Sequence, residues 1–149
     1  MHYAQLFLGL CLHGIVKLAI PMSRNESPAY PFCAMVEYCE NAPDIVLYDN
    51  ACHLSEFAAN REPDFFRNTL FVVDKFHWPN HTSCSRSFNS RLYPQSNAAN
   101  SQLAEQFNKT LKKLATSVQF SKAENYKLFL TSFIILHNRK LIAKMHDSM

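Results

Sequence analysis

The chain has 149 residues, of which 48% are hydrophobic and 18% are charged, and its formal net charge is +3. This length and apolar content suit one folded domain and exclude a disordered tail. A charge this small does not by itself indicate a nucleic-acid partner. The two glycines are far below the usual share of about 7%, so most turns must use proline, asparagine and serine.

Residues 6–20 are apolar enough to imitate a signal peptide or a membrane anchor. However, His13 and Lys17 interrupt the stretch, no Lys or Arg precedes it, and it falls short of the roughly 20 consecutive apolar residues that a membrane span needs. We therefore predict two adjacent strands, residues 6–10 and 15–20, joined by a turn. No membrane partner is expected.

The rest of the chain alternates helical and strand-like patterns. We predict helices at residues 29–39, 53–60, 103–118 and 123–144, strands at residues 45–48 and 69–73, and a loop-rich stretch at residues 76–99. The last two helices have apolar residues at spacings of three and four, which is typical of amphipathic helices. The order of elements predicts an α/β fold with a mixed sheet flanked by helices.

The cysteines indicate the cellular compartment. They number five, an odd count, and their spacing is irregular, unlike the even frameworks of small secreted domains. This pattern favours a reducing compartment, nuclear or cytoplasmic. Acceptor triplets for glycosylation at Asn25, Asn80 and Asn108 keep a small secreted glycoprotein as a less favoured alternative.

Two acidic residues are candidates for a catalytic metal site. Asp49 directly follows a short apolar run, and in α/β sheets metals and ligands gather where strands end. Glu105 lies in the opening turns of the third predicted helix. Each residue also has a structural interpretation, because Asp49 can cap the following helix and Glu105 can pair with Lys109 four residues later.

A second candidate site combines thiols and imidazoles. It consists of Cys52, His77, His81 and Cys84, with the last three close together in the sequence. Thiolate and imidazole are the ligands that zinc prefers, and four of them complete a tetrahedron. The spacing matches no common zinc-finger class, and the alternative of a partly buried histidine beside a core cysteine stays open.

Several short motifs together carry a family resemblance over residues 13–138. They are Cys-Leu-His-Gly at 11–14, Glu-Ser-Pro at 26–28, Tyr-Asp-Asn-Ala-Cys at 48–52, Asn-Arg-Glu-Pro at 60–63, Val-Asp-Lys-Phe-His-Trp at 73–78 and Asn-Ser-Gln-x-x-Glu-Gln at 100–106. In this order they resemble the Kyakuja-Dileera-Zisupton transposases. The order of the motifs is as specific as the motifs themselves.

The resemblance implies one partial catalytic domain over residues 1–149, with a ribonuclease H-like fold and additional C-terminal helices. It implies a DDE transposase that uses magnesium or manganese to cleave and join DNA, with Asp49 as the second acid and Glu105 as the third. The first acid lies in this family on a strand upstream of the Cys-Leu-His-Gly motif. We therefore expect a chain that lacks this strand, is inactive alone and folds marginally, because neighbouring strand edges stay unpaired.

The resemblance also bears on zinc, partners and alternative functions. The family keeps His and Cys residues between its second and third acids, which supports a structural zinc at Cys52, His77, His81 and Cys84. DNA is the implied partner, and an oligomer of the transposase type is implied. A host-recruited module that binds nucleic acid or protein without catalysis remains the alternative, since basic residues cluster in both C-terminal helices at Lys109, Lys112, Lys113, Arg139, Lys140 and Lys144.

Overall fold

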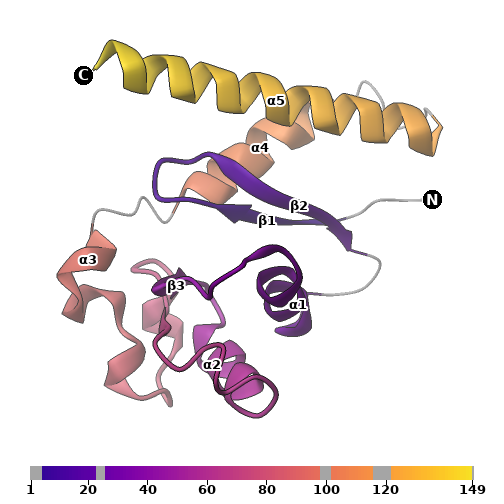
Figure 1. Cartoon of the computed structure of the whole chain (residues 1–149). Helices are drawn as coiled ribbons and strands as arrows, with labels where there is room; N and C mark the ends of the chain where they lie inside the picture. Colours follow the sequence, from indigo (N-terminus) through magenta and orange to yellow (C-terminus); the bar gives the residue numbers. More distant parts are fainter. Residues whose placement is uncertain (1–4, 23–25, 98–101, 116–121, 149) are drawn as a thin grey trace. The chain divides into compact units, whose positions relative to one another are not determined.

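The computed structural model describes residues 5–22, 26–97, 102–115 and 122–148, which form a mixed α/β structure (Figure 1). They separate into two compact units. We call the unit within Met1–Ser23 and Gln102–Met149 the terminal unit, and the unit within Arg24–Ser101 the central unit. Asn25 and Val118, to which two of the sequence predictions extend, lie outside the described residues.

The terminal unit begins with the predicted hairpin. Strands β1 (Gln5–Leu10) and β2 (Val16–Met22) pair antiparallel, with an irregularity in register after Gly9. Gly14 closes the turn with a φ of 83°, a conformation that other residues rarely adopt. A Cβ at this position would also meet the side chain of Leu103 at 3.4 Å. The turn conformation therefore requires glycine at this position, whereas a Cβ would make only ordinary van der Waals contact with Leu103.

Two helices pack against this hairpin. The predicted amphipathic helix is α4 (Leu103–Ala115), and the last helix is α5 (Ala123–Asp147), which ends three residues beyond the predicted boundary. Their apolar faces and the hairpin share one core, with buried members Val16, Phe107, Leu111 and Leu130. Spacing at three and four places these helix residues on a single face, so burial against the hairpin stabilises both helices.

The central unit contains the remaining helices and strands. Its elements are α1 (Ala29–Tyr38), β3 (Ile45–Leu47), α2 (Ala51–Ala59) and β4 (Leu70–Val72), in agreement with the sequence prediction. Strands β3 and β4 pair parallel, and α2 connects them in the chain. The buried core of this unit consists of Phe32, Met35, Ala51, Leu54, Ala58, Phe66, Phe71 and Val73.

The stretch after β4 is rich in turns, as predicted. It contains three single-turn 3₁₀ helices, η1 (Trp78–Asn80), η2 (Arg86–Phe88) and η3 (Ser90–Leu92), and the short helix α3 (Pro94–Asn97). The buried hydroxyl of Ser96 donates to the carbonyl of Tyr93 at 2.7 Å. Backbone hydrogen bonds join Val73 to Phe88 and to Ser90, which holds the returning chain beside β4.

The pairing of the strands differs from the sequence prediction. Within the described ranges the four strands form two separate two-stranded sheets, one antiparallel and one parallel, rather than one mixed sheet. The hairpin pairs through its local turn, whereas β3 and β4 pair across a helical connection. No described strand hydrogen-bonds to both pairs, so the α/β class is confirmed and the ribonuclease H-like sheet stays a prediction.

Candidate metal centre

The strand-to-helix turn after β3 carries the first predicted site residue, Asp49. The backbone N–H of Tyr48 donates to Val72 at 3.1 Å, which extends the parallel pairing by one residue. Asp49 follows in the turn and is half-buried, and the N–H of Ala51 then donates to the carbonyl of Tyr48 at 3.2 Å as α2 begins. Asp49 therefore lies at the carboxyl end of a parallel strand, the position where α/β sheets bind ligands.

The side chain of Tyr48, the residue before Asp49, connects this turn to the segment that precedes α1. Its hydroxyl donates to Oε1 of Glu26 at 2.9 Å. Burial, reinforced by the hydrogen bond and the negative charge of Glu26, raises the pKa of Tyr48 above its ordinary range. At a pH where an unfolded tyrosine begins to ionise, the folded Tyr48 therefore keeps its proton.

We expect this tyrosine to make the protein less stable at alkaline pH. An unfolded tyrosine loses its proton near pH 10 while the folded Tyr48 retains it, so the unfolded state is favoured as the pH rises above about 10. In thermal unfolding from pH 8 to 11, Tyr48→Phe should show a smaller fall in Tm than the wild type. Tyr38→Phe, at an exposed position, is the control, and equal falls for wild type and Tyr48→Phe would contradict the prediction.

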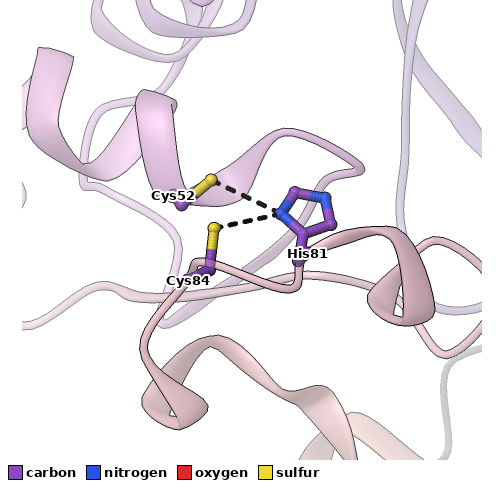
Figure 2. A group of neighbouring side chains, drawn as sticks. All are labelled: Cys52, His81 and Cys84. Carbon is purple, nitrogen blue, oxygen red and sulfur yellow. Dashed lines mark hydrogen bonds between the residues drawn. The ribbon is translucent and has the colours of Figure 1, made fainter.

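Cys52, His81 and Cys84 come together in the central unit. Cys52 lies in the first turn of α2, whereas His81 and Cys84 follow η1 in the loop after β4 (Figure 2). The Nδ1 atom of His81 lies 3.6 Å from Sγ of Cys52 and 3.3 Å from Sγ of Cys84. All three ligand atoms are within 4.8 Å of one another, and all three residues are half-buried.

These distances suit a tetrahedral zinc ion. Bonds of about 2.3 Å to sulfur and about 2.0 Å to nitrogen place the nitrogen and a sulfur about 3.5 Å apart at a tetrahedral angle. The two nitrogen-to-sulfur distances are close to this value. Two thiols and one imidazole are also soft ligands, which favour zinc over magnesium. The three side chains can therefore bind a metal ion without a large rearrangement.

The thiols influence each other in the absence of a cation. A hydrogen bond with the Cys52 thiol is the main cause that raises the pKa of Cys84, and burial adds to it. Two adjacent thiolates would repel each other, so without a metal the protonated form of Cys84 is favoured. A bound cation reverses this preference because it stabilises the thiolates directly.

Local structure explains why the loop presents His81 and Cys84 together. The N–H of His81 donates to Trp78 at 2.9 Å, and the N–H of Cys84 donates to His81 at 3.2 Å. The ring of Trp78 lies parallel to the imidazole of His81, with the two ring centres 6.3 Å apart. These successive tight turns place the two side chains on the same side of the loop.

The fourth predicted ligand, His77, does not belong to this cluster. Its Nδ1 atom lies 2.5 Å from Oδ2 of Asp74, a residue that is only 7% exposed. The other oxygen of Asp74 accepts from the backbone N–H groups of Phe76 and His77. Asp74 was not among the residues predicted for a site, although it follows the apolar strand run 69–73 just as Asp49 follows the run 45–48.

Asp74 and Asp49 occupy equivalent places in the parallel pair. Each lies two residues beyond the end of its strand, and Leu47 and Val72, the last residues of those strands, are register partners. Both acids therefore belong to the carboxyl edge of the same sheet. Glu105, by contrast, lies exposed in the first turn of α4, in the terminal unit.

Comparison with known proteins identifies the family. The family model of the Kyakuja-Dileera-Zisupton (KDZ) transposases matches residues 1–138. The chain belongs to the KDZ transposase family. The match includes all six predicted site residues of this KDZ chain, in both units. Searches of curated proteins and of solved structures found no match.

Across the described residues, no helix combines the length with the apolar character that crossing a bilayer requires.

Proposed function

We propose that this KDZ chain forms part of a DDE transposase catalytic domain of ribonuclease H-like fold, derived from an enzyme that cleaves and joins DNA strands. The family match carries the proposal. It is supported by the order of elements, with an antiparallel hairpin first and a parallel pair connected by a helix later in the chain. The position of Asp49 at the end of β3 supports it as well.

In this proposal Asp49 and Glu105 are the second and third catalytic acids. When bound, two magnesium or manganese ions activate the attacking oxygen and stabilise the leaving oxygen of a phosphodiester. The carboxylates hold and orient these ions, and each acid is needed because one ion alone does not support both tasks.

DNA is the proposed partner, and the nucleus or cytoplasm the proposed compartment. In the terminal unit, exposed basic side chains lie on α4 at Lys109 and Lys112 and on α5 at Arg139, Lys140 and Lys144. Such side chains can neutralise phosphates and make DNA affinity depend on salt. The same residues favour a second candidate function, a non-catalytic nucleic-acid-binding module. An oligomer of the transposase type remains part of the first proposal.

Divalent-ion binding separates these two functions. We expect the chain to bind Mn²⁺ weakly in electron paramagnetic resonance titrations, and Asp49→Asn and Glu105→Gln each to lower this affinity about tenfold, because each removes an ionised oxygen ligand. Asp44→Asn, at the opposite end of β3, and Glu124→Gln, in the first turn of α5, are matched controls. Salt-dependent DNA binding with no Mn²⁺ binding would overturn the roles of Asp49 and Glu105 as metal-binding acids and favour the module.

We also propose that the metal centre of Cys52, His81 and Cys84 binds a structural zinc ion. Three protein ligands leave the fourth position of the tetrahedron to water or to another group. His77 can be that group only if the loop moves, because no ligand atom of His77 belongs to the set that lies within 4.8 Å of one another.

Metal analysis of the purified chain tests the zinc site. About one zinc per chain is expected in the wild type, and less than about a tenth of that in His81→Ala, since the loss of an imidazole from a three-residue site removes most of its affinity. His53→Ala, at an exposed position beside Cys52, should retain zinc. Wild-type protein with less than a tenth of an equivalent, prepared without chelator, would contradict the proposal.

A further inference from the structure

The start of α2 lacks the usual means of holding a helix N-terminus. Its N-cap residue, Asn50, makes no side-chain capping hydrogen bond, and the first turn contains no acidic residue. The Asn50 side chain instead accepts a long contact of 3.8 Å from the thiol of Cys52. An N-cap side chain that accepts from the first backbone N–H groups ordinarily stabilises a helix, and this contribution is missing here. The turn that contains Asp49 therefore leads into a helix whose start has no side-chain cap.

The metal centre is attached to this same helix end. Cys52 lies three residues after Asp49, in the first turn of α2. At this helix start the backbone N–H of Ala51 donates to Tyr48 at 3.2 Å and that of Leu54 donates to Asn50 at 3.1 Å. A metal bound to the Cys52 thiolate would thus restrain a segment that the helix itself does not cap.

The other two ligands lie in a loop that is well anchored. Asp74, at the end of β4, accepts three contacts from the residues that follow it, and Trp78 donates to the carbonyl of Asp74 at 3.0 Å. His81 and Cys84 continue this series of turns. A metal bridge would therefore connect the uncapped start of α2, which follows β3, to the loop after β4.

We infer that metal binding at Cys52, His81 and Cys84 positions the Asp49 turn, so that the centre is a positioning site for this acid. The two connections it would join leave the same edge of the parallel sheet. That Asp49 is a ligand of a catalytic ion rests on the proposed function. The restraint of the turn by a bound metal is independent of the proposed function, because it follows from the chain positions of Cys52, His81 and Cys84.

Hydrogen exchange and Mn²⁺ binding, measured on the full chain, test this inference. The samples are zinc-loaded wild type, chelator-treated wild type, Cys84→Ser, and the control Cys33→Ser, whose thiol is exposed on α1 outside the centre. Zinc loss should speed exchange of the Ala51 and Leu54 amides about tenfold, because local opening of the turn becomes easier. It should also weaken Mn²⁺ affinity about fivefold. Cys33→Ser should match the zinc-loaded wild type in both measurements.

The outcomes distinguish this inference from the proposed function. Unchanged exchange at Ala51 and Leu54 after zinc removal, or a wild-type chain that binds no zinc, would overturn the positioning role. Faster exchange without any Mn²⁺ binding in the zinc-loaded chain would support the positioning role and remove the catalytic ion site instead. If Cys84→Ser does not fold, the chelator-treated wild type still gives the comparison, and its return to slow exchange on adding zinc is the expected result.

Discussion

Replacement of Leu54 by alanine is expected to lower the free energy of unfolding of the central unit by about 2–5 kcal/mol, because it leaves a cavity in a closely packed core. Leu54 is fully buried on α2, within the cluster that includes Phe32, Phe66 and Phe71. A small domain has only about 5–15 kcal/mol of stability, so this single change should populate the unfolded state measurably.

Fluorescence of the single tryptophan is the direct measurement, since Trp78 belongs to the central unit. Urea unfolding followed at this residue should shift to a lower midpoint in Leu54→Ala. Leu92→Ala, at a position that is 53% exposed in the same unit, should change the stability by less than about 0.5 kcal/mol. A midpoint for Leu54→Ala within error of the wild type would show that this core is not packed as described.

Replacement of Asn138 by alanine is the second large expected effect, and it concerns the terminal unit. The Asn138 side chain on α5 accepts from the N–H of Val16 at 2.9 Å and donates to the carbonyl of Val16 at 3.0 Å. It therefore satisfies both backbone groups of a buried residue at the start of β2. Removing it leaves two polar groups unpaired in a partly buried position, at a cost of about 2–4 kcal/mol.

Far-ultraviolet circular dichroism is the suitable probe, because the helices α4 and α5 belong to the terminal unit whereas Trp78 does not. Asn138→Asp is a graded variant, since a carboxylate keeps the acceptor for the Val16 N–H and loses the donor to its carbonyl. Arg139→Ala, the exposed neighbour on the same helix, is the control. Equal stability of Asn138→Ala and Arg139→Ala would contradict the role assigned to this side chain.

Local patterns were enough to predict the elements of this fold. Short apolar runs rich in β-branched residues became β3 and β4, and spacings of three and four residues became α1, α4 and α5. These signals act within a few residues of sequence, through backbone preferences and the need to bury one face. The pairing of strands cannot be predicted in this way, because it depends on contacts between segments that are distant in the sequence. The two separate two-stranded sheets were therefore not predicted.

The candidate sites show the same division. The chemistry of thiols and imidazoles predicted a zinc centre from sequence, and the structure brings together Cys52, His81 and Cys84 but not His77. That His77 lies outside the cluster and contacts Asp74 is visible only in the structure, because both facts depend on how the loop after β4 folds. Asp49 lies at the strand end where the sequence analysis predicted it, and its role with Glu105 as an acid pair stays a prediction.

The sequence by itself determined the family, the types and order of the elements, and the residues from which a metal centre can be built. These properties depend on residue identity and on short-range periodicity. Only the tertiary structure decided which histidine joins the two thiols, which backbone groups Asn138 satisfies, and how the four strands divide into pairs. Each of these features depends on contacts between groups that are far apart in the sequence. Such contacts are set by the packing of the whole unit.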